Sequence, residues 1–164
     1  LLDAKRQAAV DHILAAARRL VLAKGLDVTM DDLAEVSGAS RRTLFRHFAG
    51  RDELLEEVAR QGFEEFADLL ERAFNEGRPS PLSAVMRMGQ AYLTFAAQRR
   101  GYYIAMFESG ISIAGNAGLS QASDRARGVL VRGAEALFLK MPADRRPPPG
   151  DTASALETVT STWQ

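Results

Sequence analysis

The chain has 164 residues, and 46% of them are hydrophobic, which is enough for a packed core. It contains no cysteine, which excludes disulfide bonds, zinc ribbons and thiol catalysis, and no apolar run approaches the roughly 18 residues of a membrane span. The 21 basic and 21 acidic residues balance to a net charge of zero, so a role in nucleic-acid binding would have to rest on a local cluster.

The first predicted helix runs from about Lys5 to Ala23. Its apolar residues recur at steps of three and four, which places them in one stripe on one face of a helix. Lys24 and Gly25 follow, and they are typical of a helix C-terminus. The stripe consists of Val10, Ile13, Leu14, Ala17, Leu20 and Val21.

Two short helices joined by a turn at Gly38 are predicted next. Thr29 caps the first of them, although its hydroxyl is equally suited to a phosphate contact, and both roles stay open. Ser40 caps the second, which runs to about Phe48. Leu44 and Phe48 lie one turn apart, so we expect both to pack inward against the first helix.

The second of these short helices carries a basic cluster. No acidic residue occurs between Glu35 and Asp52, whereas five basic side chains do. Charge alone would indicate only a solvated helix end. Together with the turn, the hydroxyls and the apolar spacing, it indicates a helix-turn-helix whose second helix enters the major groove of DNA. The basic residues are Arg41, Arg42, Arg46, His47 and Arg51.

This segment resembles the tetracycline-repressor (TetR) family of bacterial transcription regulators over roughly residues 8 to 55. The residues that carry the resemblance are Gly25, Thr29, Leu33-Ala34, Gly38, Ser40, Thr43-Leu44-Phe45, His47-Phe48 and Arg51-Asp52. Phe45 stands where the family usually has Tyr, and Arg51 stands where it usually has Lys. The cluster and the resemblance together predict the following DNA-contacting residues: Thr29, Ser40, Arg41, Arg42, Thr43, Phe45, Arg46, His47 and Arg51.

The rest of the chain is also predicted to be helical, which makes the fold all-α. We expect helices over 52–75, 82–96, 102–107 and 119–141, and a further one from Asp151 through Leu156, Val159 and Trp163. The helix over 82–96 is expected to use Leu82, Val85, Gly89, Tyr92, Leu93 and Ala96 as one apolar side.

The predicted domains are a three-helix DNA-binding domain over 1–51 and a helical ligand-binding and dimerisation domain over 52–164. The helix over 52–75 connects them and is the strongest candidate for a rigid lever. Members of the family normally end in two antiparallel helices that pair with a second copy, so the resemblance implies a chain truncated at its C-terminus.

A binding role is predicted for residues 82–141, which are rich in aromatic residues and methionine. Such side chains can line an apolar pocket between helices or simply fill the core. The resemblance implies a small inducer in this region and so favours the pocket. Its expected lining is Met86, Tyr92, Phe95, Tyr103, Phe107 and Phe138.

No catalytic motif is found. A Gly-rich phosphate loop, a His-Glu-x-x-His helix and a Gly-x-Ser-x-Gly elbow are all missing from the sequence. With two histidines and no cysteine, we expect no metal site, no cofactor and no enzymatic activity. The start shows no secretory signal, so a cytoplasmic protein without membrane contact is expected.

Two functions fit these observations. The first is a ligand-responsive DNA-binding transcriptional regulator, most simply a homodimeric repressor that a small apolar or aromatic molecule releases from a palindromic operator on double-stranded DNA. The second is a helical ligand-binding or protein-interaction module that keeps the scaffold without specific DNA binding. The basic cluster between Arg41 and Arg51 favours the first.

Overall fold

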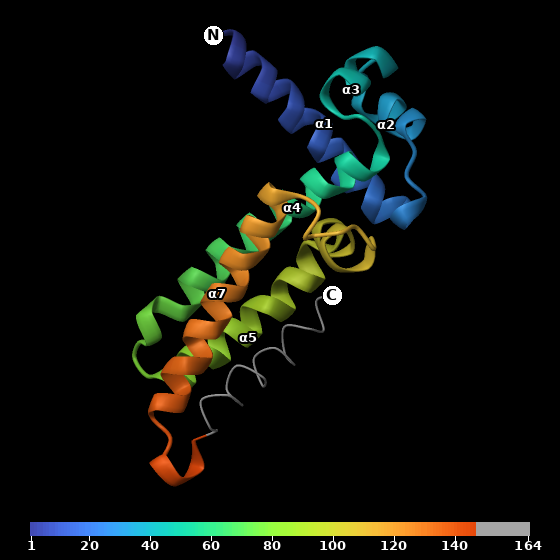
Figure 1. The fold of residues 1–164 in the computed structure, drawn as a ribbon. Coiled ribbons are helices and arrows are strands. Elements are labelled where there is room, and N and C mark those ends of the chain that lie inside the picture. Colours follow the sequence, from blue (N-terminus) through green and yellow to red (C-terminus); the bar gives the residue numbers. More distant parts are fainter. Residues whose placement is uncertain (147–164) are drawn as a thin grey trace. The chain divides into compact units, whose positions relative to one another are not determined.

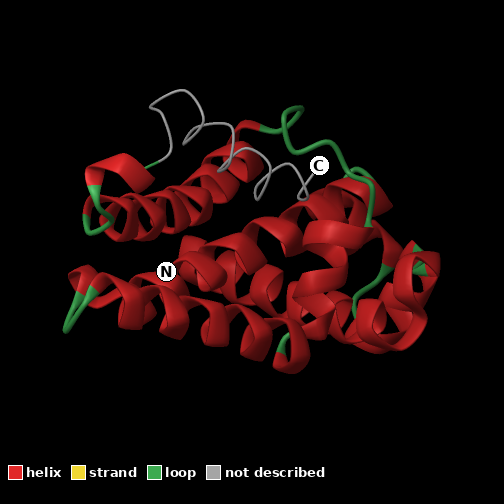
Figure 2. Ribbon diagram, turned by 90° about the horizontal axis from the view of Figure 1, so that it is seen from below, coloured by secondary structure: helices red, strands yellow, loops and turns green. Residues whose placement is uncertain are grey.

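A computed structural model of the chain describes residues 1–146, and these form helices joined by turns and loops (Figure 1). No strand occurs in this described part (Figure 2), so the predicted all-α class is confirmed for it. The helix predicted from Asp151 lies outside the described residues. None of the described helices combines the length and the apolar character needed to cross a bilayer.

The main helices lie where the sequence predicts them, with ends that shift by less than a turn. The segment after α6 differs, because it is wound as a π-helix, which no periodicity in the sequence indicates. The elements are α1 (Leu2–Lys24), η1 (Gly25–Asp27), α2 (Met30–Ser37), α3 (Arg41–His47), α4 (Arg51–Phe74), η2 (Asn75–Gly77), α5 (Pro81–Gln98), α6 (Arg100–Tyr103), the π-helical η3 (Ile104–Glu108), α7 (Ala117–Leu139) and η4 (Ala143–Arg145).

The contacts divide the chain into two compact units. The first contains residues 1–62 and 99–120, and the second contains residues 63–98 and the described residues from 121 on. The first unit therefore combines the three N-terminal helices with a segment that comes later in the sequence. The boundary predicted between residues 51 and 52 divides the chain by function and not by contacts, and it stays a prediction.

The core of the first unit forms around α1, which packs beside α2, while α2 packs beside α3 (Figure 1). The predicted stripe of α1 is buried from Ile13 to Val21, and only Val10 at its start is partly exposed. Leu44 is fully buried and Phe48 is 4% exposed, which confirms that α3 turns this side inward. Burying each such side chain contributes about 1.5–3 kcal/mol.

The segment 99–120 is joined to α1 by an unusually close contact. A Cβ atom at Gly101 would lie 2.6 Å from the carbonyl oxygen of Arg18, so only glycine lets α6 approach α1 this closely. The adjacent Tyr102 is buried, and its hydroxyl accepts a hydrogen bond of 2.9 Å from Nη1 of Arg18. These contacts hold α6 against the middle of α1.

The second unit has an aromatic core in which Phe66 of α4 meets two residues of α5. The ring centroid of Phe66 lies 5.7 Å from that of Tyr92 and 5.0 Å from that of Phe95. On the side of α7, Arg125 forms a 2.5 Å ion pair with Asp68 of α4. Helix α7 also passes close to α5 at Gly133, where a Cβ atom would lie 2.9 Å from Sδ of Met88.

The apolar side predicted for α5 is buried only in part, because Tyr92 contacts Phe66 of the core and Val85 and Ala96 are half-buried. Leu82 and Leu93 are 58% and 63% exposed, whereas the buried residues are Ala84, Met88 and Phe95. Both sets follow helical spacing, since α5 carries apolar residues on two faces. Periodicity alone cannot tell which of two apolar faces meets the core.

Replacing Gly101 tests the contact between α6 and α1. In Gly101→Ala the new methyl group meets a backbone oxygen, so the helices must move apart, and we expect the free energy of unfolding to fall by about 1–3 kcal/mol. The control is Gly128→Ala in α7, where a Cβ atom meets nothing within 4 Å. That variant should be neutral or more stable by about 0.5–1 kcal/mol. Urea unfolding followed by circular dichroism measures both, and equal stability of the two variants would contradict the close contact.

Candidate nucleic-acid interface

The turn between α2 and α3 is built around Gly38. Its backbone lies in the left-handed region, with φ 72° and ψ 2°, which a residue with a Cβ atom adopts only with strain. The Gly38 N–H donates to the carbonyl of Ala34 at 3.0 Å and so closes the end of α2. This places α3 directly after α2 in the arrangement of a helix-turn-helix.

Both short helices begin with a hydroxyl cap. Thr29 Oγ1 accepts from the Asp32 N–H at 3.1 Å, and the Asp32 carboxylate accepts from the Thr29 N–H at 3.0 Å, which completes a capping box. Ser40 Oγ accepts from the Thr43 N–H at 3.1 Å and lies 3.0 Å from the Thr43 hydroxyl. The capping role of Thr29 and Ser40 is confirmed, and their contact with phosphate stays a prediction.

The arginines of α3 fall into two groups. Arg42 and Arg46 lie one turn apart on the exposed side opposite Leu44, and within the described residues neither forms an ion pair. Arg41 instead lies on the flank toward α2, where its Nη1 is 2.7 Å from Oδ1 of Asp31. Its guanidinium carbon is 5.8 Å from the ring centroid of Phe45, which is 44% exposed.

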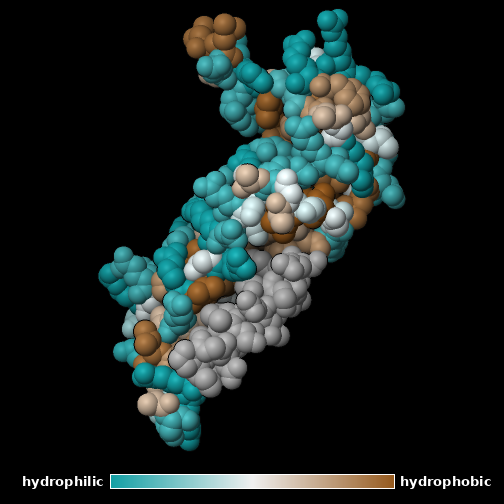
Figure 3. Space-filling model, viewed as in Figure 1, coloured by the Kyte–Doolittle hydropathy of each residue, from teal (hydrophilic) through white to brown (hydrophobic). Residues whose placement is uncertain are grey.

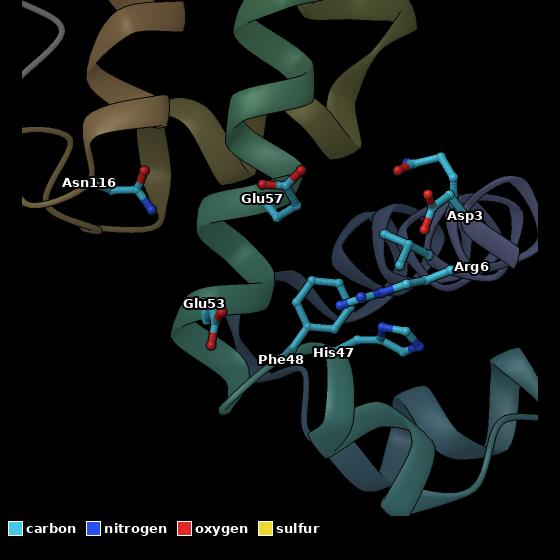
Figure 4. Close-up of a pocket in the computed structure, with 9 residues that line it drawn as sticks. Asp3, Arg6, His47, Phe48, Glu53, Glu57 and Asn116 are labelled. Carbon is cyan, nitrogen blue, oxygen red and sulfur yellow. The ribbon is translucent and has the colours of Figure 1, made fainter.

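His47 and Arg51 lie apart from this surface. His47 lines a cavity of about 440 Å³ together with Arg6 of α1 and the carboxylates of Glu53 and Glu57 (Figure 4). Arg51 donates to the carbonyl of Leu26 and so ties the start of α4 to η1. Both residues remain candidates for phosphate contacts, but Arg51 already has a structural partner.

A structural histidine in this region is not apparent from the sequence. Nε2 of His12 lies 3.0 Å from the carbonyl oxygen of Ser37, which joins α1 to the end of α2. Ser37 is 9% exposed, and its hydroxyl accepts from the Ala39 N–H at 3.2 Å. A serine directly before a turn glycine indicates that its hydroxyl will bind a nearby backbone N–H. Nothing in the sequence indicates that His12 will contact the carbonyl of Ser37.

One carboxylate of the helix-turn-helix has a strongly shifted pKa. The ion pair with Lys24, at 2.6 Å, lowers the pKa of Asp32 from 3.8 to about 2, and the hydrogen bonds from Thr29 act in the same direction. Asp32 therefore stays ionised at neutral pH, and the positive end of the α2 dipole favours that charge.

The visible surface over α2 and α3 is mainly hydrophilic, with one pale brown patch (Figure 3). Surfaces that bind DNA are more polar than those that bind other proteins, and this surface has that character.

The six residues predicted to bind a ligand belong to both units. Tyr103 and Phe107 are in the first unit, with ring centroids 4.9 Å apart. Tyr92 and Phe95 are in the second unit, where both rings lie beside Phe66. Met86, which is 68% exposed, and the half-buried Phe138 also belong to the second unit. The ligand pocket stays a prediction.

Comparisons with known proteins agree with the geometry of the helix-turn-helix. Residues 13–58 match the model of "Bacterial regulatory proteins, tetR family". Over 77 residues the chain is 34% identical to YvaF, an uncharacterised HTH-type transcriptional regulator of Bacillus subtilis, and the match covers 47% of this chain and 40% of YvaF. An uncharacterised HTH-type transcriptional regulator of Haemophilus influenzae is 36% identical over 78 residues, which cover 45% of this chain and 42% of that protein.

A solved structure extends the similarity of the fold to nearly the whole chain. The TetR-family transcriptional regulator PfmR of Thermus thermophilus superposes with a TM-score of 0.71 at 22% identity, covering 93% of this chain and 81% of that one. The matches to the two curated relatives, by contrast, span less than half of each relative's length.

The lowered pKa of Asp32 predicts how its contribution to stability depends on pH. Because the folded-state pKa lies below the ordinary value, the ionised carboxylate stabilises the fold above about pH 4, and this contribution is lost as the pH falls toward 2. Asp32→Asn should therefore lower the melting temperature at pH 7, and its difference from the wild type should narrow between pH 4 and pH 2. Asp27→Asn, at an exposed position of η1, is the control. A difference that stays constant over this range would contradict the prediction.

Proposed function

The chain belongs to the TetR family of bacterial regulatory proteins, and from this premise we propose that it is a transcriptional repressor released from DNA by a small apolar or aromatic ligand. The observation that carries the proposal is the exposed face of α3. Arg42 and Arg46 project from it without carboxylate partners in the described chain, so their charge is available to phosphates or base edges.

Two copies of the chain are proposed to act together. One helix-turn-helix offers little contact area, whereas a two-fold pair reads two half-sites and gains both affinity and specificity. Such a pair binds a palindromic operator on double-stranded DNA, since the symmetry of the protein is repeated in the site.

The proposed route for the ligand signal uses segment 99–120 as well as α4. This segment packs on α1 through Gly101 and Tyr102, and Asn116 donates to the carboxylate of Glu56 on α4 at 2.8 Å. At both ends it continues into the helices of the second unit, α5 and α7. A ligand that moves either end of this segment can therefore displace α1 directly, without relying on α4 alone.

The DNA-binding role is tested by removing one outward charge. Arg46→Ala should weaken binding to operator and random duplexes alike if Arg46 contacts phosphate, and it should reduce the slope of log K against log salt by about 1. The operator probe is the duplex that the wild-type chain enriches from a random-sequence pool, and binding is measured by fluorescence anisotropy. Arg127→Ala removes an exposed arginine of α7 as the charge-matched control. Wild-type binding by both Arg46→Ala and Arg42→Ala would show that this face does not meet DNA.

The ligand-release mechanism is tested by linkage. If a compound lowers operator affinity by a given factor, operator DNA must lower the affinity for that compound by the same factor, and a coupling of about 1–3 kcal/mol is typical. The probe is a small apolar or aromatic compound that raises the melting temperature of the chain. Its affinity is measured by calorimetry with and without the enriched duplex. Equal affinity in the two titrations would remove the inducer mechanism and leave DNA binding intact.

A further inference from the structure

Arg41 is the one arginine of α3 that two helices hold in place among the described residues. The carboxylate of Asp31, on the first turn of α2, accepts from its Nη1 at 2.7 Å. On α3 itself, the ring of Phe45 lies 5.8 Å from the guanidinium carbon. The side chain is thus bound at one nitrogen and supported on one face, while 62% of it remains exposed.

This arrangement leaves most of the guanidinium free for a further partner. Arginine has five N–H donors in a planar fork, and the contact with Asp31 engages one of them. Two of the remaining donors can bind O6 and N7 of a guanine together, which is the commonest specific contact in the major groove. A flexible arginine loses rotamer freedom when it makes that contact, and one that is already oriented loses less.

A carboxylate on the surface that faces DNA needs an explanation. Asp31 is 69% exposed on α2, and its charge repels phosphates whatever their sequence. An exposed ion pair of this kind also adds little to stability. The dipole of α2 favours an acidic residue in its first turn, but it does not account for the contact between this carboxylate and Arg41.

We propose that Asp31 is a positioning residue for sequence recognition: it orients Arg41, with Phe45 as the supporting face, so that Arg41 reads a guanine. This rests on the proposed function, because it assumes that α3 enters the major groove. It also separates the arginines of α3 into one base reader, Arg41, and two that supply sequence-independent affinity, Arg42 and Arg46.

The proposal predicts opposite effects of Asp31→Asn on two kinds of DNA. Loss of the carboxylate relieves repulsion, so binding to a random duplex should tighten slightly. Loss of orientation should lower the ratio of operator to random affinity by about three- to tenfold. The loss of discrimination should appear at a single G·C pair when each pair of the enriched duplex is replaced in turn.

The matched control is Glu35→Gln, which removes another exposed negative charge from the same helix, one turn further on. It should tighten binding to both duplexes by the same factor and leave their ratio unchanged. In an Arg41→Ala background, Asp31→Asn should cause no further loss of the ratio, because its target is gone. Asp31→Glu, which keeps a carboxylate, should restore part of the discrimination.

Each other outcome has a clear meaning. If Asp31→Asn changes operator and random affinity equally, as Glu35→Gln does, Asp31 acts only through its charge and the positioning role is refuted. If the ratio still falls in the Arg41→Ala background, Asp31 acts on a different group and the proposal is again refuted. If the folded wild-type chain enriches no sequence from the random pool, the proposed function itself fails, and this inference fails with it.

Discussion

The apolar stripe of α1 is the surface on which the first unit depends. From Ile13 to Val21 its side chains are buried, and α2, α6 and η3 all lie in contact with this helix. A single helix can hold so many neighbours because Gly101 lets the backbone of α6 approach the carbonyl of Arg18. Helix α1 therefore supports the helix-turn-helix and also contacts segment 99–120. Because packed interiors transmit displacement, a movement of this segment would shift α1.

In the same unit, different side chains provide the structural hydrogen bonds and the exposed positive charge. The hydroxyls of Thr29 and Ser40 satisfy the backbone at the starts of α2 and α3, and Lys24 neutralises Asp32. With those groups occupied by the fold, the exposed face of α3 keeps Arg42 and Arg46, which form no ion pair within residues 1–146. Net charge gives no support to the proposed DNA binding in a chain of zero net charge, but positive charge concentrated on one helix does.

The position of segment 99–120 bears on the ligand response that we propose for this chain. A single long helix such as α4 transmits movement only if it rotates as a rigid body. Here Tyr102 and Arg18 join the later segment to α1, while Asn116 and Glu56 join it to α4, so one segment holds both helices. The π-helical winding of η3 lies within this segment, and such windings are frequent at functional sites.

Local sequence patterns determine the helices, caps and turn of the N-terminal segment without reference to the tertiary structure. The three- and four-residue spacing of α1, the caps at Thr29 and Ser40, and the turn at Gly38 each follow from the chemistry of neighbouring residues, so the sequence alone predicts the helix-turn-helix. The fold decided the rest, because it depends on groups far apart in the chain. Packing between elements decides which of two apolar faces of α5 is buried, how closely Gly101 approaches Arg18, and whether Arg41 meets Asp31. Helical periodicity carries no information about which element a helix face will contact.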